Sequence, residues 1–243
     1  MRILSIDIGG TGLKASVIDQ KGKMLAPRQR VATPHPCPPA LLLKTVGELV
    51  KALPAFERIS IAFPGVVRDG KVLTAPNLGT AAWAGFPLAV EMSKRFGKKP
   101  AKIVNDAEMQ GLGIIKGKGL ELVLTLGTGA GTALFREGVA SPHMELGQHP
   151  AHGHETYDEF IGRAALQKLG KRRWNKRVER AVQQLDTLLN FDQLHIGGGN
   201  ARHLTFRLPR NVRIESNDAG IEGGAALWRA PKKLPPAKAI KAR

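Results

Sequence analysis

The sequence has one cysteine, few aromatic residues and far fewer acidic than basic residues. The single cysteine, Cys37, excludes an internal disulfide framework and a cysteine-rich zinc site. No apolar run reaches the roughly 18 residues that a membrane span needs. The apolar stretch in the N-terminal MRILSIDIGG is too short for a secretory signal. We therefore expect a cytoplasmic protein, and 243 residues with 42% hydrophobic content can form one large or two small folded domains.

The basic residues are concentrated in two stretches. The chain contains 37 Lys and Arg against 20 Asp and Glu, which gives a formal net charge of +17. Residues 163–180 hold eight basic side chains and one acidic one, and residues 231–243 hold five basic side chains and no acid. A local excess of this kind predicts a polyanionic partner or substrate. A solvated surface helix followed by a loose tail would explain the same pattern.

The chain contains an internal repeat. Residues 3–19 predict a strand, a glycine-rich turn and a second strand. The same order returns in ELVLTLGTGAGTALFREG, which places Leu126 in the position of Ile8. Further strands are expected over 23–32, 58–63, 101–104, 193–196 and 212–215, with a short hairpin over 66–72. Helices are expected over 41–53, 86–96, 107–115, 159–190 and 219–228.

This element order predicts an α/β protein with two similar lobes and a cleft between them. We expect an N-terminal lobe over 1–116, a C-terminal lobe over 117–229 and a disordered basic tail over 230–243. Clefts between lobes are the usual place for a small-molecule site.

The first turn, DIGGTGLK, has the composition of an anion-binding turn. Gly9 and Gly10 allow the backbone to approach a ligand closely, and successive N–H groups in such a turn can bind phosphate. Thr11 adds a hydroxyl donor and Lys14 adds a cation. Asp7, at the end of the strand, is suited to hold Mg²⁺ directly or through water. A plain hairpin turn with a structural aspartate would account for the same residues.

Two further glycine-rich segments support phosphate binding. LGTGAGT, with Gly127, Thr128 and Gly129, occupies the equivalent point of the repeat. Two such turns are expected to face each other and to hold a chain of phosphates from both sides. IGGGN, with Gly198 and Gly199, leaves room for an extended or flat group at a strand end. Tight packing against the helix over 219–228 would also explain those glycines.

The segment VNDAE contains the candidate catalytic group. Asp106 follows a buried strand, where its carboxylate could meet a reacting hydroxyl, although it could also be only a helix N-cap. Asn77, Glu145 and Glu155 are polar residues in small or apolar surroundings, as a polyhydroxylated ligand requires.

Four histidines close together raise the question of zinc. His143, His149, His152 and His154 have no cysteine near them, and their spacing matches no common structural zinc site. We expect no zinc.

Eight motifs in a fixed order resemble the ROK family of sugar kinases. They are DIGGTGLK, AFPGVV, PNLG with a following Trp, VNDAE, LGTGAGTALF, ELG, GGGN and NDAGIEGGA, and they extend over residues 3–228. The resemblance implies the actin-like, ribonuclease-H-like fold with two lobes. Within the family the chain is most similar to the polyphosphate glucokinases, which are short and lack the cysteine-rich zinc motif.

The resemblance also implies roles for individual residues. Asp106 would be the base, and the phosphates would lie on residues 7–11 and 128–129. Gly198 and Gly199 would lie near a nucleotide base or the far end of a polyphosphate. The sugar would be held by Gly65, Asn77, Asn105, Glu145 and Glu155. Gln148 stands where the family has a histidine that contacts sugar, which puts the identity of the sugar in doubt more than the reaction.

These inferences predict a kinase that phosphorylates the 6-hydroxyl of glucose or a related hexose, with Mg²⁺. The expected donor is inorganic polyphosphate, with ATP left open. A candidate polyphosphate track consists of Lys171, Arg172, Arg173, Lys176 and Arg177. The alternatives are an ATP-dependent glucokinase or another hexose kinase.

A less favoured alternative is a non-catalytic regulator that binds sugar or nucleic acid. Repressors of the family carry an N-terminal helix-turn-helix, for which the hairpin beginning at Ile3 leaves no room. We expect no membrane partner. Members of the family that the chain resembles are often dimers, and the sequence itself does not give the oligomeric state.

Overall fold

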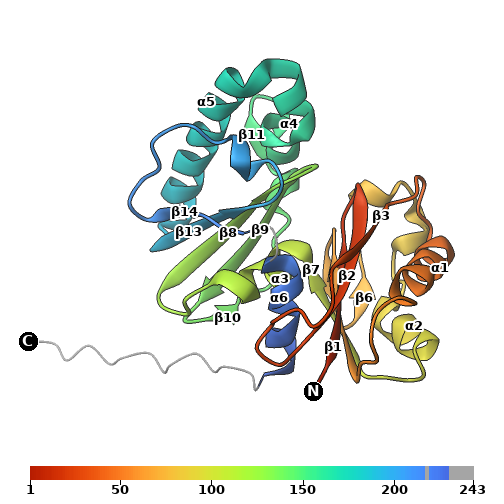
Figure 1. Cartoon of the computed structure of the whole chain (residues 1–243). Helices are drawn as coiled ribbons and strands as arrows, with labels where there is room; N and C mark the ends of the chain where they lie inside the picture. The colour runs from red at the N-terminus through yellow and green to blue at the C-terminus, as the bar shows by residue number, and fades with distance from the viewer. Residues whose placement is uncertain (217–218, 230–243) are drawn as a thin grey trace, which may run out of the picture.

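The computed structural model describes residues 1–216 and 219–229, so the basic tail expected over 230–243 lies outside the described residues. Two five-stranded sheets form two lobes (Figure 1). The first sheet contains β1 (Ile3–Ile8), β2 (Gly12–Ile18), β3 (Gln29–Ala32), β4 (Arg58–Phe63) and β7 (Ala101–Asn105). The second contains β8 (Leu120–Leu126), β9 (Ala130–Arg136), β10 (Val139–Ala140), β13 (Gln193–Gly197) and β14 (Val212–Ile214).

The two sheets have the same topology, which confirms the internal repeat. Their strand orders are β3-β2-β1-β4-β7 and β10-β9-β8-β13-β14. In each, the first hairpin is antiparallel, and its first strand then pairs in parallel with the next long strand. The glycine-rich turns therefore lie at equivalent points, between β1 and β2 and between β8 and β9.

Helices and short hairpins complete the two lobes. The helices are α1 (Pro39–Val50), α2 (Leu88–Arg95), α3 (Asp106–Ile114), α4 (Tyr157–Ile161), α5 (Arg163–Leu189) and α6 (Ala219–Glu222). The short hairpins are β5 (Val67–Arg68) with β6 (Lys71–Val72), and β11 (Pro150–His152) with β12 (Glu155–Thr156). None of the described helices has both the length and the apolar composition to cross a membrane.

Three expected elements differ in the structure. The strand expected over 23–32 is reduced to β3, because Pro27 lacks the N–H group that a ladder needs. The helix expected over 159–190 is divided at Gly162 and kinked at Gly170, whose φ of 73° is not helical. The helix expected over 219–228 continues after Glu222 as a 3₁₀ helix, Gly223–Trp228.

Each sheet buries apolar side chains against its own helices. On β1, Leu4 and Ile6 pack in one cluster with Val46 of α1 and Met92 of α2. On β8, Leu122 and Leu124 pack with Trp174, Val178 and Leu185 of α5. Alternate side chains of the strands and the helically spaced side chains of α1 and α5 thus form a separate core in each lobe.

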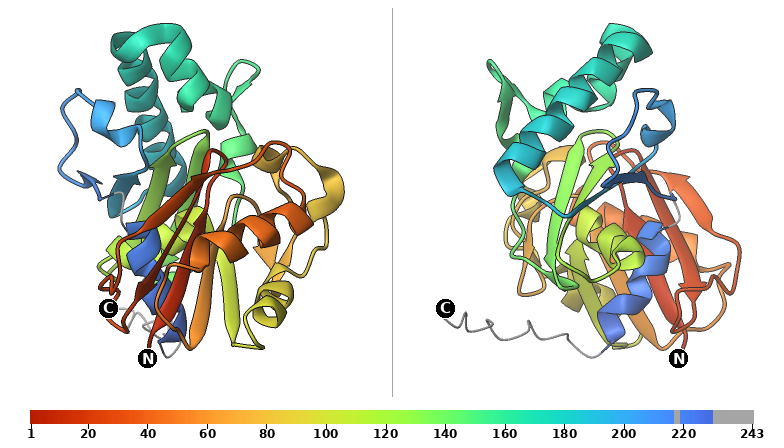
Figure 2. Two further views of the ribbon diagram at one scale, coloured as in Figure 1. Left: turned by 45° about the vertical axis from the view of Figure 1, so that its right-hand side comes forward. Right: turned by 90° about the vertical axis from the view of Figure 1, so that its left-hand side faces the viewer.

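The C-terminal helical segment packs on the first sheet, although the expected boundaries assign it to the second lobe. Ser5 Oγ of β1 donates to Ile221 O at 2.8 Å, and Ser60 Oγ of β4 donates to Gly224 O at 2.7 Å. Gly113 of α3 allows this segment to approach, because a Cβ there would lie 2.7 Å from Ala219 O. α3 and α6 lie side by side between the lobes in both figures (Figure 2).

Candidate active site

A cleft of about 710 Å³ lies between the two lobes. Its volume is within the usual range for small-molecule sites. The cleft brings together most of the residues singled out in the sequence: Asp7, Gly9, Gly10, Thr11, Lys14, Gly65, Asn77, Asn105, Asp106, Gly127, Thr128, Gly129, Glu145, Gly198 and Gly199.

The first glycine-rich turn is braced by the segment that follows β3. Thr33 Oγ1 donates to Gly9 O at 2.6 Å, and His35 Nε2 lies 2.7 Å from Gly10 O. The N–H of Gly9 donates within the turn, to Gly12 O at 3.0 Å, so the N–H groups of Gly10 and Thr11 are the donors that the turn can offer to an anion.

The second turn is braced in the same way by its own lobe. The backbone N–H of Arg163 donates to both Gly127 O and Thr128 O at 3.1 Å. Asn200 Nδ2 also donates to Gly127 O, at 2.8 Å. The two turns face each other, since a Cβ built on Gly10 would lie 3.5 Å from Thr128 Oγ1. The two turns are thus close enough for one bound group to contact both.

Gly198 and Gly199 of the GGGN segment have different surroundings. Gly198 has a φ of 85°, and a Cβ there would lie 2.5 Å from Leu126 O, so the end of β8 requires a glycine. This close approach is to β8, not to the 219–228 segment. A Cβ on Gly199 would have nothing within 4 Å, so this position faces open cleft.

Asp106 opens α3 without serving as its N-cap. Asn105 is the cap, since its Oδ1 accepts from Ala107 N at 2.8 Å and its Nδ2 donates to Gly65 O at 3.1 Å. Asp106 Oδ1 also accepts from Ala107 N at 2.8 Å, and no other donor from the described residues reaches this carboxyl. Asp106 therefore keeps capacity to accept a proton or a hydrogen bond in the cleft.

The surroundings of Asp106 suit a general base. Burial and the nearby carboxylate of Asp7, with a smaller contribution from Glu145, raise the pKa of Asp106 from 3.8 to about 7. A pKa near neutrality balances availability of the ionised form against its strength as a proton acceptor.

Asp7 lies at the carboxyl end of β1 and pairs with Lys14. Lys14 Nζ is 2.7 Å from Asp7 Oδ2, and the two residues are cross-strand neighbours. No group of three or more metal-ligating side chains occurs among the described residues. A single carboxylate beside two glycine-rich turns fits Mg²⁺, which commonly uses one or two carboxylates, waters and substrate phosphates.

His143 lies buried between two carboxylates next to the cleft. Its Nδ1 is 3.5 Å from Glu108 Oε1, and its Nε2 is 3.6 Å from Glu145 Oε2. Burial alone would lower the pKa of His143, but the two carboxylates raise it to about 9. His143 is therefore an imidazolium at neutral pH, which links Glu145 to the helix that carries Asp106. The other three histidines of the cluster do not join it in a metal-ligating group among the described residues.

Asp158 lies in the cleft and was not singled out from the sequence. Its Oδ1 accepts from Ala130 N at 2.6 Å, and its Oδ2 accepts from Gln148 Nε2 at 2.8 Å. Burial raises the pKa of Asp158, and Glu145 adds to that effect. Gln148 itself is exposed and does not line the cleft.

Glu155 lies outside the cleft, contrary to its expected place beside the sugar. Its Oε1 accepts from Arg177 Nη1 at 2.9 Å, while that guanidinium also stacks 4.6 Å from the Phe160 ring centroid. Glu155 and Asp158 are close together in the sequence, and α4 begins between them at Tyr157. Asp158, in the first turn of α4, is the one that reaches the cleft.

The expected polyphosphate track on α5 is also separate from the cleft. None of Lys171, Arg172, Arg173, Lys176 and Arg177 lines it. Instead, four arginines that the sequence reading missed do so: Arg28, Arg30, Arg163 and Arg202. Arg30 lies in β3, and Arg28 directly precedes the first residue of that strand.

Comparisons with known proteins agree with this geometry. A model of the ROK family matches residues 3–168. The polyphosphate glucokinase of Mycobacterium tuberculosis (strain CDC 1551 / Oshkosh) is 31% identical over 239 residues, covering 90% of this chain and 88% of the relative. That of Mycobacterium leprae (strain TN) is also 31% identical, over 92% of this chain and 74% of the relative.

Solved structures show the same fold. The inorganic polyphosphate/ATP-glucomannokinase of Arthrobacter sp. strain KM matches with a TM-score of 0.84 and 28% identity, over 93% of this chain and 97% of that one. A ROK family glucokinase from Streptomyces griseus, in complex with glucose and AMPPNP, matches with a TM-score of 0.76. It is 20% identical, over 93% of this chain and 99% of that one, and so shows the fold alone. The expected actin-like fold is confirmed, and the chain belongs to the ROK family.

Proposed function

We propose that this chain is a kinase that transfers a phosphoryl group to the 6-hydroxyl of glucose, with inorganic polyphosphate or ATP as the donor. The observation that carries the proposal is Asp106, a carboxyl with a pKa of about 7 that stands in the cleft beside two facing phosphate-binding turns. The names of the relatives, which are polyphosphate glucokinases and a polyphosphate/ATP-glucomannokinase, support this choice of substrates.

The proposed step is an in-line displacement. The ionised Asp106 accepts the proton of the 6-hydroxyl while the sugar oxygen forms a bond to the terminal phosphorus. The bond from that phosphorus to the bridging oxygen breaks, and the donor leaves one phosphate shorter. Positioning and electrostatic stabilisation supply most of the catalysis in such reactions.

The two turns hold the donor in line with the hydroxyl. Backbone N–H groups of both turns and the Thr11 and Thr128 hydroxyls contact the phosphate oxygens. Lys14 neutralises charge on the phosphates or on Asp7, which it contacts in the structure. Kinases of this kind generally use Mg²⁺, and we propose Asp7 as its protein ligand. The ion would supply further neutralisation of the phosphate charge.

The sugar lies at the end of the cleft that contains the carboxylates. Asn77, Glu145 and Asp158 offer acceptors and donors to its hydroxyls, and Asp158 takes the role that the sequence reading gave to Glu155. Asn105 already bonds Gly65 and the N-terminus of α3, so it positions these elements as well as facing the cleft. A cytoplasmic location and a homodimer stay predictions.

Product analysis tests this proposal. Glucose and 6-deoxyglucose are each incubated with the protein, Mg²⁺ and either donor, and phosphorus NMR identifies the products. We expect glucose 6-phosphate from glucose and no sugar phosphate from 6-deoxyglucose. Phosphorylation of 6-deoxyglucose, or of a different glucose hydroxyl, would contradict the proposed orientation.

A further inference from the structure

We infer that the donor end of the cleft is a path for a linear polyphosphate chain, formed by Arg30 and Arg28 on one wall and Arg202 on the other. This inference rests on the proposed kinase function and adds to it the residues that select the donor. It moves the expected track from α5 into the cleft.

The chemistry of the cleft wall favours a polyanion over a nucleotide base. Among the described residues that line the cleft there is no Phe, Trp, Tyr, Leu, Ile, Val or Met. Ligand pockets for flat aromatic groups are lined mainly by apolar and aromatic side chains. The cleft is lined instead by glycines and by polar and charged side chains, which suit a chain of phosphates, and Gly199 has open space beside it.

Arg30 continues the first phosphate turn. It is the cross-strand neighbour of Lys14, which in turn is the neighbour of Asp7, so the three side chains form a row across one face of the sheet. A Cβ on Gly12 would lie 3.3 Å from Arg30 Nε, so the guanidinium stands directly over the end of the turn. A phosphate that leaves the turn therefore meets Arg30 next.

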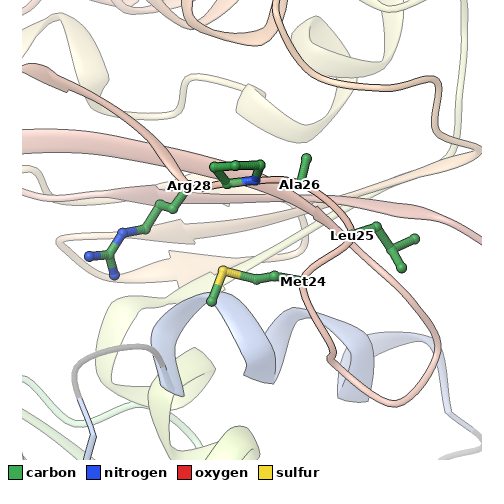
Figure 3. Close-up of a pocket in the computed structure, with 5 residues that line it drawn as sticks. Met24, Leu25, Ala26 and Arg28 are labelled. Atoms are coloured by element: carbon green, nitrogen blue, oxygen red, sulfur yellow. The ribbon is translucent and has the colours of Figure 1, made fainter.

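Arg28 extends this row toward the outside of the protein. It lines the cleft and also a second hollow of about 530 Å³ formed with residues 24–27. The side chains of Met24 and Arg28 extend to the side of the loop that faces α6, whereas Leu25 points away from them (Figure 3). The shared arginine joins the cleft to this open hollow and gives a long chain a way out.

Arg202 supplies positive charge on the opposite wall. It lies in the 3₁₀ turn Ala201–His203, directly after the GGGN segment, and is exposed in the cleft. Arginines on both walls can contact successive phosphates from two sides, which a single basic helix face outside the cleft cannot do.

The test compares two double variants that remove the same charge. Arg28→Gln/Arg30→Gln removes two arginines of the path, and Arg172→Gln/Arg173→Gln removes two exposed arginines of α5 that lie outside the cleft. Arg202→Gln removes the arginine on the opposite wall of the cleft and tests its contribution to binding. Binding of long-chain polyphosphate and of tripolyphosphate is measured by calorimetry over a range of salt concentrations. KM is measured for both donors and for ATP.

We expect the Arg28/Arg30 variant to bind long-chain polyphosphate roughly tenfold or more weakly. Its dependence of log K on log salt should flatten by about 0.7 per lost phosphate contact. Tripolyphosphate, which spans fewer contacts, should lose less. The α5 variant should bind like the unmodified protein.

Equal losses in both double variants, or a loss only in the α5 variant, would overturn the path. The path would also be overturned if the protein phosphorylated glucose with ATP but bound no polyphosphate. That result would leave the proposed kinase function intact. Absence of phosphorylation with either donor, while the Arg28/Arg30 variant still loses polyphosphate binding, would contradict the kinase function and retain the anion path.

Discussion

Gly10 and Thr128 face each other across the cleft, with 3.5 Å between a Cβ built on Gly10 and the Thr128 hydroxyl oxygen. They belong to turns in different lobes that are 118 residues apart in the repeat alignment of Ile8 with Leu126. Their proximity means that one group of phosphates can contact both turns at once. Closing or opening the cleft would therefore change the contacts that the two turns make with the donor.

Removing the Thr128 hydroxyl tests whether the second turn, as well as the first, binds the phosphate donor. We expect Thr128→Val to raise KM for the phosphate donor about tenfold or more, since a hydrogen bond to a charged group contributes roughly 1.5–3 kcal/mol. KM for glucose should change little. Thr45→Val is the control, because the Thr45 hydroxyl bonds only within α1, at 2.8 Å from Leu41 O. Equal effects of the two substitutions on donor KM would contradict a role for Thr128.

The raised pKa of Asp106 has a consequence for stability. Its pKa of about 7 in the folded protein exceeds 3.8, so the protonated group stabilises the fold at low pH. That contribution is full below pH 3.8 and is lost as the pH rises through 7. We expect Asp106→Asn to be more stable than the unmodified protein by about 1–3 kcal/mol at pH 8, and by much less at pH 5. Urea unfolding at the two pH values measures this, and a difference that does not depend on pH would argue against the shift.

The raised pKa of His143 gives a pH dependence of the same sign, over a higher pH range. Its pKa of about 9 lies above 6.5, so it stabilises the fold fully below pH 6.5 and loses this effect as the pH rises through 9. We expect His143→Gln to lower the free energy of unfolding by roughly 1–3 kcal/mol at pH 6.5 and by much less near pH 10. Because Glu145 loses its neighbour, KM for glucose should also rise. An equal loss of stability at both pH values would indicate packing alone.

Asp158 and Glu155 form a matched pair for the sugar end. We expect Asp158→Asn to lower kcat/KM for glucose roughly tenfold or more, because one oxygen of a carboxyl group in the cleft is replaced by an amide donor. Glu155→Gln should leave kcat/KM within about twofold, since Glu155 pairs with Arg177 outside the cleft. Steady-state kinetics over a glucose series separates the two. A large effect of Glu155→Gln with a small effect of Asp158→Asn would restore the assignment made from the sequence.

Local patterns predicted much of this molecule. Short apolar runs followed by glycine-rich turns indicated the two hairpins, and the strand that ends at Asn105 indicated where Asp106 would stand. Long-range register could not be predicted. The cleft position of Arg30 depends on the pairing of β3 with β2, and the docking of Ile221 depends on contacts with β1 more than 200 residues earlier. The basic residues of α5 were prominent in the sequence and suggested an anion-binding track. In the structure, Arg177 of α5 instead forms an ion pair with Glu155.

The most direct test of the account is glucose 6-phosphate formation by the unmodified protein and by Asp106→Asn, each with long-chain polyphosphate and with ATP. We predict Mg²⁺-dependent turnover in the unmodified protein, with an acid limb near pH 7. The variant should fold but lose about 10²–10⁴-fold in kcat with either donor, the usual contribution of a general base. Turnover in the variant within a few-fold of the unmodified protein would contradict the role of Asp106 as the base.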